Sequence, residues 1–261
     1  MTIYVHEWKQ NQKSLWIWTI AVAAMILICM MLYPQMKEQA DSVSEMFSQM
    51  GGFSSAFGMD QVNFGDALGF FAIECGNVLA LGGVMFSALL GIGMLGKEEN
   101  LHTAEFLLTH PISRRRVLAQ KLAAMYTLLV VFYAINFVVT TASFLGVGEE
   151  IPWKELEMVY AANLLLAFEV SSICYAVSAF LRTASAGMGI GIGILLYFFN
   201  LYGNIAKDAE WVKYVTPFSY ADASKIIADG ALDTKLLWLG LVYLVVGIAI
   251  AFFRYIRKDI A

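Results

Sequence analysis

A short run of glycines ending in a lysine carries the pattern that most directly suggests chemistry. Residues 91–97, Gly-Ile-Gly-Met-Leu-Gly-Lys, satisfy both the GxGxxG pattern of dinucleotide sites and the first seven positions of a phosphate-binding loop. The next residue, Glu98, stands where such a loop needs a Ser or Thr hydroxyl for magnesium. The glycines also continue an apolar run, whereas a nucleotide site places them between a strand and a helix. We therefore expect a transmembrane helix here and no cofactor bound directly.

The other residue types that serve catalysis or metal binding are scarce and scattered. The chain has three histidines, His6, His102 and His110, and all lie outside the apolar runs. No GxSxG, HExxH or CxxC motif occurs. The three cysteines lie inside apolar runs, where they are expected to pack as small hydrophobic residues. The sequence predicts a protein that has no metal site and is not catalytic alone.

Two carboxylates, Glu74 and Glu169, lie within apolar runs. An ionisable side chain at membrane depth is costly, so it usually faces a cavity or a partner. One interpretation is that both line a translocation pathway and bind cationic or amphipathic cargo. The other is that they are protonated or hydrogen-bonded to nearby amides, such as Asn77 or Asn163, and only hold the helices together. The residues leave both interpretations open.

Composition and apolar run lengths place these residues in a membrane protein. The 261 residues are 59% hydrophobic and 15% charged, whereas soluble domains carry about 25% charged residues. A bilayer crossing takes about 20 mostly apolar residues. Six runs qualify, and they predict a single all-α integral membrane domain over residues 1–261. The predicted spans are 15–33, 68–95, 117–145, 158–181, 186–205 and 236–253.

The distribution of basic residues predicts the orientation. With the N-terminus in the cytoplasm, 11 of the 17 Lys and Arg residues fall on the cytoplasmic side, as the positive-inside rule requires. Both termini are therefore expected inside. Those residues are Lys9, Lys13, Lys97, Arg114, Arg115, Arg116, Lys121, Arg182, Arg254, Arg257 and Lys258.

Segments outside the spans, and small residues within them, suggest further elements. Residues 2–14 predict an interfacial helix, and 34–66 and 206–234 predict two amphipathic segments on the outside. In the first of these, apolar residues recur at helical spacing, which suits a helix on the surface or one over the mouth of the bundle. Span 186–205 carries two small-xxx-small pairs, for packing within the bundle or for a dimer contact. The recurring residues are Met36, Ala40, Val43, Phe47 and Met50, and the pairs use Gly187, Gly189, Gly191 and Gly193.

The most informative segment, residues 97–116, connects the second and third spans on the cytoplasmic side. Leu101, Ala104 and Leu108 share one face at helical spacing, Pro111 ends the helix, and three arginines at 114–116 anchor the next span. A short amphipathic helix held between two spans can dock in a groove of a cytosolic protein and transmit its motion. It can also simply lie on lipid. Physical reasoning alone leaves these two readings open.

The run Glu99–Arg114, ENLHTAEFLLTHPISR, resembles the cytoplasmic signature of type-2 ABC transporter permeases, E-x-x-G-T-x-E-x-L-L-x-x-P-[IV]-S-R. His102 stands where the signature has Gly. Three further stretches show a moderate likeness to the same family, and the resemblance covers essentially the whole chain. They are His6–Lys9 near the start, Thr216–Tyr220 in the second outer segment and Phe253–Ile260 at the end.

This resemblance implies a bacterial plasma-membrane exporter subunit, multi-pass and surrounded by membrane lipids. It would pair with a second permease copy or a paralogue and with two copies of a separate ATP-binding subunit, which would hold ATP and magnesium. Amphipathic peptides or hydrophobic molecules would be moved outward, and no nucleic acid is involved. Residues 98–110 would form the coupling helix. Its expected contacts with the ATPase are Glu98, Glu99, Leu101, His102, Thr103, Glu105, Phe106, Leu108, Pro111 and Arg114.

Other function classes remain open alternatives. An ion-coupled secondary carrier, or a sodium or drug efflux protein, would use Glu74 and Glu169 as coupling sites. Such carriers usually show inverted repeats with broken helices in matching positions, and no internal repeat is evident in this chain. A structural or regulatory membrane partner is a third possibility.

Overall fold

The computed structural model describes residues 2–100, 113–181, 183, 185–206 and 211–258, with side chains for all of these except residues 2 and 97–100. Within these residues, six helices are long and apolar enough to cross a membrane, which confirms the six predicted spans. No strand occurs in the described residues. Five spans are α1 (Thr2–Lys37), α7 (Arg114–Gly146), α8 (Trp153–Phe180), α9 (Ala186–Ile205) and α12 (Thr234–Ile256), and the remaining one joins α4 (Ala67–Phe70), the π-helical turn η1 (Phe71–Gly76) and α5 (Asn77–Asn100).

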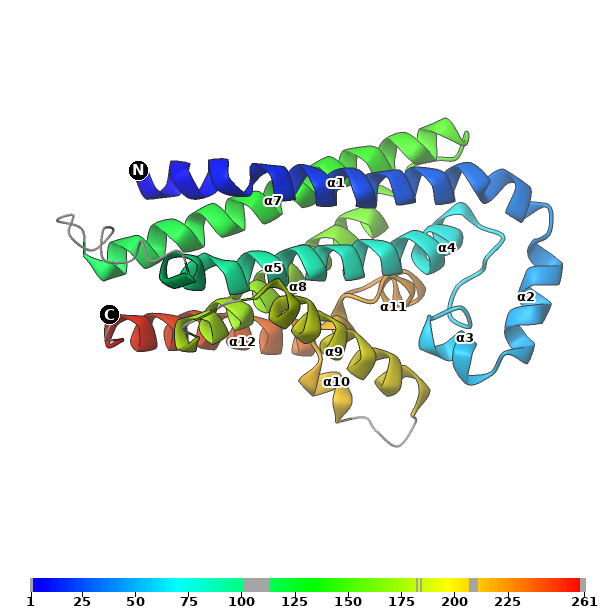
Figure 1. Cartoon of the computed structure of the whole chain (residues 1–261). Coiled ribbons are helices and arrows are strands. Elements are labelled where there is room, and N and C mark those ends of the chain that lie inside the picture. Colours follow the sequence, from blue (N-terminus) through cyan, green and yellow to red (C-terminus); the bar gives the residue numbers. More distant parts are fainter. Residues whose placement is uncertain (1, 101–112, 182, 184, 207–210, 259–261) are drawn as a thin grey trace.

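The spans form a bundle around two central helices. Of the most apolar stretch of each span, 72% is buried in the α4–η1–α5 helix and 67% in α8, against 33% in α1, 17% in α9 and 22% in α12. The outer helices therefore present apolar faces to their surroundings. Figure 1 shows both termini at one end of the bundle, which we call the terminal end.

The first span begins earlier than the sequence predicted. Residues 2–14 form the first turns of α1 and are not a separate interfacial helix, because one unbroken helix of 36 residues runs from Thr2 to Lys37. This segment contains no glycine or proline that would interrupt the helix. Its Ile3 and Glu7 side chains are buried, as is Leu15 just beyond it. The N-terminal turns thus pack against the bundle.

Short helices cover the end of the bundle opposite the termini. α2 (Ala40–Gln49) and α3 (Gly52–Ala56) follow α1 there (Figure 1). The apolar side of α2 packs inward, with Phe47 edge-on to Phe64 at 5.3 Å between ring centroids. Of the two readings of this segment, the structure thus favours a helix over the mouth of the bundle.

Lys37 Nζ lies 2.7 Å from Glu149 Oε1 at this end, and that contact holds the pKa of Glu149 below its usual value.

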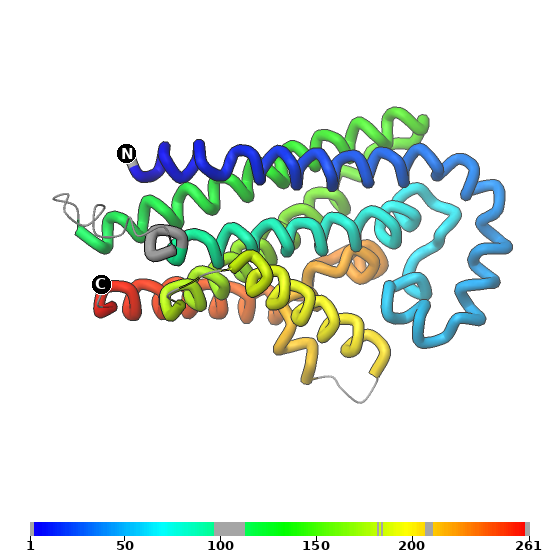
Figure 2. Tube along the Cα trace, in the orientation of Figure 1, coloured from blue at the N-terminus to red at the C-terminus, as the bar shows by residue number. Residues whose placement is uncertain are grey.

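The residues between α9 and α12 turn back into the bundle. They form α10 (Val212–Val215), the 3-10 turn η2 (Pro217–Tyr220) and α11 (Ala223–Asp229), and Figure 2 shows this orange segment beside the middle of the long helices. Tyr220 contacts Glu169, which lies about 24 Å along α8 from Trp153 at 1.5 Å per residue. The segment is therefore re-entrant. It does not stay at the outer interface, where the sequence predicted it.

The glycines of α9 divide between two faces. A Cβ added at Gly189 would lie 2.9 Å from the Ala88 carbonyl oxygen of α5, and Gly193 faces the same helix. This pair lets the two helices approach closely. Gly191 has nothing within 4 Å, and Gly187 meets only Ser185, at 3.9 Å. Packing within the bundle is thus confirmed for one pair, and the other pair faces away from the chain.

Candidate functional site

The predicted coupling segment is described only at its two ends. Glu98 and Glu99 lie in the last turn of α5, where the backbone alone is described, and Arg114 is the first residue of α7. Both ends lie at the terminal end of the bundle (Figure 1). The other seven predicted contacts lie outside the described residues: Leu101, His102, Thr103, Glu105, Phe106, Leu108 and Pro111.

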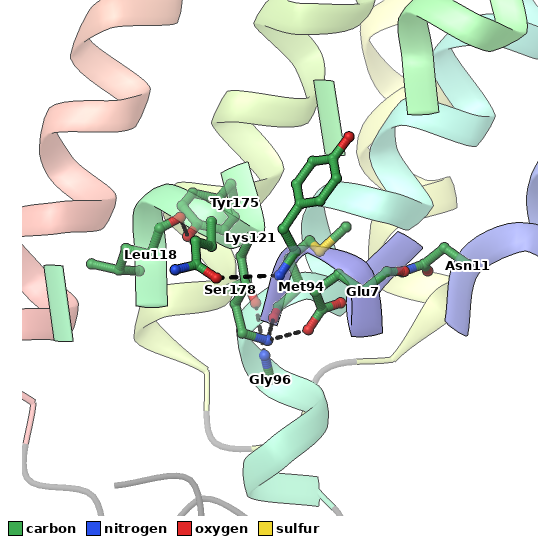
Figure 3. Close-up of polar contacts among 10 residues, drawn as sticks. Glu7, Asn11, Met94, Gly96, Leu118, Lys121, Tyr175 and Ser178 are labelled. Atoms are coloured by element: carbon green, nitrogen blue, oxygen red, sulfur yellow. Dashed lines mark hydrogen bonds and ion pairs between the residues drawn. The ribbon is translucent and has the colours of Figure 1, made fainter. Parts of the chain in front are cut away.

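A buried ion pair joins three helices next to this segment, on its bundle side. Lys121 of α7 is fully buried, and its Nζ donates to Glu7 Oε1 at 2.8 Å and to the Met94 carbonyl oxygen at 2.7 Å. Glu7 is on α1 and is 1% exposed, and Met94 lies in α5. Figure 3 shows the three groups meeting around the lysine nitrogen. Removing one member of a buried ion pair destabilises a protein far more than replacing the whole pair with apolar residues. Because the lysine contacts both other helices, it fixes the start of α1 against α5 and α7.

Two further contacts add α8 to this cluster. Ser178 Oγ donates to the Ile92 carbonyl at 2.8 Å and accepts from the Gly96 N–H at 3.1 Å. Tyr175 Oη donates to the Leu118 carbonyl of α7 at 3.1 Å. Four helices therefore meet where α5 enters the coupling segment (Figure 3). We call Glu7, Met94, Gly96, Leu118, Lys121, Tyr175 and Ser178 the brace.

The nucleotide-like glycine run lies inside this packing. Residues 91–97 are helical within α5, which excludes a phosphate-binding loop formed by them in this structure. A Cβ at Gly91 would lie 2.4 Å from the Ser171 carbonyl oxygen and 2.8 Å from Cys174 Cβ, both on α8. Gly91 therefore allows the two central helices to touch. Gly93 has nothing within 4 Å of such a Cβ.

The other end of the coupling segment is attached to the C-terminal residues. Arg114 Nη1 donates to the Lys258 carbonyl at 2.6 Å and to the Ile256 carbonyl at 3.3 Å, at the end of α12. Lys258 Nζ in turn donates to the Leu181 carbonyl, at the end of α8, at 2.6 Å. Cations suit the carbonyl-rich C-terminus of a helix. The predicted contact Arg114 is thus engaged within its own chain.

Replacing Arg114 with alanine should loosen this attachment. The loss of charge-assisted hydrogen bonds to helix-end carbonyls is expected to lower the free energy of unfolding by about 1–2 kcal/mol. Thermal unfolding of the purified protein in lipid nanodiscs measures this change. Arg115→Ala is the matched control, because Arg115 is exposed and surface substitutions usually change stability by less than about 0.5 kcal/mol. Equal effects of the two substitutions would contradict this role of Arg114.

The buried carboxylate Glu169 has a partner that the sequence did not reveal. Its Oε2 accepts from Tyr220 Oη at 2.7 Å, whereas its Oε1 is buried and has no hydrogen-bond partner among the described residues. The amide of Asn163, expected as a partner, donates to the Val159 and Ala221 carbonyls. Tyr220 reaches this depth because residues 212–229 turn back to mid-span, and the sequence gives no signal for that path.

Glu74, the second carboxylate within the spans, lies apart from Glu169 and its pocket. It belongs to the π-helical turn η1 and is partly exposed, and no hydrogen bond to its carboxylate is found among the described residues. Asn77, its expected partner, donates to the Ile73 carbonyl of its own helix. The pocket that Glu169 lines does not include Glu74. The structure therefore gives the two carboxylates separate surroundings.

Comparison with known proteins agrees with this architecture. The chain matches the family model described as ABC-2 family transporter protein over residues 1–260. It is also 23% identical over 202 residues to the protein YhcI of Bacillus subtilis (strain 168). That match covers 68% of this chain and 64% of YhcI, so less than two thirds of the relative's length is spanned. Because the family match extends over nearly every residue, the chain belongs to the ABC-2 family of transporter proteins.

Proposed function

We propose that this permease is the membrane half of an ATP-driven exporter in the bacterial plasma membrane, with both termini in the cytoplasm. Its partners are two copies of a separate ATP-binding subunit, which hold ATP and magnesium, and a second permease copy or paralogue. The cargo is an amphipathic peptide or a hydrophobic molecule, moved from the cytoplasm or inner leaflet outward. The orientation rests on the 11 of 17 Lys and Arg residues that fall on the side of the termini.

The observation that carries this proposal is the anchoring of both ends of residues 97–113. At one end Lys121 and Ser178 hold the last turns of α5 to α1, α7 and α8. At the other end Arg114 holds the start of α7 to the end of α12. An ATPase that moves the predicted coupling helix therefore pushes on five of the six spans together. Coupling of this kind rocks a bundle as a body, which suits alternating access.

Substitution of the two signature acids tests the proposal. Glu99→Gln with Glu105→Gln removes both charges from the predicted ATPase contact. We expect the variant to lose at least tenfold of cargo-stimulated ATPase activity, or to stop co-purifying with the ATPase subunit, because charge-assisted contacts across an interface are strong. Glu45→Gln, on exposed α2 at the opposite end, is the matched control. Wild-type ATPase stimulation and wild-type co-purification in the double variant would overturn the proposal.

Cargo contact at Glu169 needs a second conformation. The cavity beside Glu169 has a volume of about 10 Å³, room for about one water molecule. A peptide or drug would reach Glu169 only after α12 moves away from α8. Partly exposed Glu74 carries no such restriction.

A second candidate function is ion-coupled transport. It is favoured by one observation, the buried Oε1 of Glu169 that has no hydrogen-bond partner among the described residues. Transport into vesicles separates the two functions. Uptake that needs ATP and the ATPase subunit supports the exporter, whereas uptake driven by an ion gradient without ATP supports the carrier.

A further inference from the structure

The unsatisfied oxygen of Glu169 needs an occupant that the chain does not supply. Glu169 is 0% exposed near the middle of α8. Its Oε2 accepts the Tyr220 hydroxyl, and its Oε1 has no partner among the described residues. An ionised oxygen there lacks a donor, and a protonated one lacks an acceptor, so neither state is satisfied by the protein alone. Buried polar atoms of this kind are costly and usually indicate a bound water or ion.

The space beside Glu169 limits the size of that occupant. The cavity of about 10 Å³ is bounded by Glu169, by α10 and η2, and by α12, which is enough for a single water molecule. Gly240 of α12 provides this room, because a Cβ at that position would lie 2.8 Å from Glu169 Oε2 and 3.0 Å from the Tyr220 ring. The occupant is therefore the size of water.

A larger pocket lies next to this cavity and reaches the exposed surface. It has a volume of about 140 Å³ and shares Lys213, Tyr220 and Leu236 with the small cavity. Its other lining residues include Asp229 and Asp233, which are exposed. We call this pocket the vestibule. Irregular backbone at membrane depth, such as that of residues 212–229, is tolerated where it is buried in protein or lines a water-filled cavity. The lining residues that the two pockets share make the vestibule the route that we assign to water.

We propose that Glu169 is a proton-binding site served from the side of the vestibule. A hydronium ion that enters the small cavity transfers its proton to Oε1 of the carboxylate. The carboxylate becomes a neutral carboxyl group, and one water molecule stays in the cavity. Tyr220 continues to donate to Oε2. Release of the proton reverses these steps. With the orientation proposed above, the vestibule faces outward and the proton comes from the external solution.

The lining of the cavity favours a proton over a metal cation. Calcium and magnesium take about six or more oxygen ligands, and Glu169 is the single carboxylate among the described residues that line the cavity. Thr216 already donates to the Leu196 carbonyl, and Tyr243 donates to the Tyr214 carbonyl. A proton needs none of these ligands.

The other titratable groups around the site can be told apart from Glu169. The substitution Glu169→Gln removes this carboxyl group alone and leaves the other titratable groups in place. They belong to α10, η2 and α12, to the vestibule wall and, beyond Tyr220, to α7. These groups are Lys213, Tyr214, Tyr220 and Tyr243, then Lys225, Asp229 and Asp233, and finally Tyr133.

Infrared difference spectroscopy of the full chain in lipid nanodiscs tests the proposal without the ATPase subunit. Lowering the pH should produce a C=O stretch of a protonated, buried carboxyl group. This band should be absent from Glu169→Gln and present in Glu74→Gln. Tyr220→Phe removes a hydrogen bond that stabilises the charged carboxylate, so the midpoint of the band should rise by about one to two pH units. A band that persists in Glu169→Gln, or a midpoint unchanged in Tyr220→Phe, would overturn the proposal.

The access route has its own test. Leu236→Trp should fill the connection between vestibule and cavity and slow hydrogen–deuterium exchange of the Glu169 carboxyl by at least tenfold. Leu241→Trp on the same helix is the control, because Leu241 is 37% exposed and lines neither pocket. Equal exchange rates in both variants would contradict access through the vestibule. A sodium-dependent loss of the band at constant pH would replace the proton with a metal cation.

The side of proton entry separates this inference from the proposed function. In vesicles, a pH jump on the side opposite the termini should change the band at once, and a jump on the terminal side should not. The reverse result would overturn the vestibule route. The exporter proposal fails through different measurements, namely ATPase stimulation and co-purification, so the two failures are distinguishable.

Discussion

Lys121→Met is expected to destabilise the protein by about 3–5 kcal/mol, the usual cost of removing one partner from a buried ion pair. Methionine keeps most of the length of lysine but cannot donate to Glu7 Oε1 or to the Met94 carbonyl, which Lys121 contacts at 2.8 and 2.7 Å. Glu7 stays 1% exposed in the folded state and loses its contact with this ammonium. A lower thermal unfolding midpoint in nanodiscs and a lower yield would show the effect.

Two controls isolate the ion pair from a general effect of methionine. Lys13→Met makes the same change at an exposed position of α1 and should alter stability by less than about 0.5 kcal/mol. The double variant Glu7→Leu with Lys121→Met removes both charges and should recover much of the lost stability, because apolar replacements of whole buried pairs are often neutral. If the double variant is no more stable than Lys121→Met alone, the pairing is not the source of the effect.

The second large effect is expected from Gly91→Ala. The new Cβ would lie 2.4 Å from the Ser171 carbonyl oxygen and 2.8 Å from Cys174 Cβ. The neighbours are backbone and a side-chain root, so they cannot rotate away, and the two central helices must separate. Overpacking a core usually costs about 1–3 kcal/mol and occasionally more, and α5 and α8 are the most buried spans. Thermal unfolding and the fraction of folded protein after extraction measure the loss.

Gly93→Ala is the matched control within the same seven residues. Nothing lies within 4 Å of a Cβ at Gly93, and alanine favours a helix over glycine by about 1 kcal/mol. This variant should therefore be as stable as the wild type or more stable. The comparison also tests the nucleotide-like pattern. A phosphate site would need both glycines, because they allow the tight turn and the close approach of the backbone to the phosphate. Equal damage at both positions would contradict the packing explanation.

Several features were predictable because they follow from local composition. The six spans, and the helical state of Gly91–Lys97, follow from apolar run length and from the absence of strand signals. The amphipathic repeat of residues 36–50 correctly predicted the helix α2, Ala40–Gln49, although Met36 belongs to α1 and the repeat did not show which surface α2 covers. The boundary of the first span was missed by about a dozen residues. Polar residues such as Glu7 predicted that residues 2–14 lie at the membrane interface. Only the contact between Glu7 and Lys121 explains how a charged residue can belong to a buried helix.

The side-chain partners were not predictable, and the reason is geometric. Lys121 was visible as a charge inside the predicted span 117–145 and Glu7 as a charge near the start. Their pairing spans 114 positions and depends on how α1 lies against α7. Tyr220 was visible only as part of an outer segment. Its contact with Glu169 requires residues 212–229 to turn back into the bundle, and the local sequence does not encode that path.

The sequence by itself determined that this chain crosses a membrane six times and that residues 97–116 interrupt its spans with a polar segment. Those properties depend on the free energy of transferring side chains into lipid, and this free energy is a sum over residues that are neighbours in the sequence. Tertiary structure alone decided which helices lie at the centre, which charges meet in the brace, and which oxygen of Glu169 is left unsatisfied. Those properties depend on contacts between residues far apart in the chain, because close packing lets one glycine or one lysine fix the position of several helices at once.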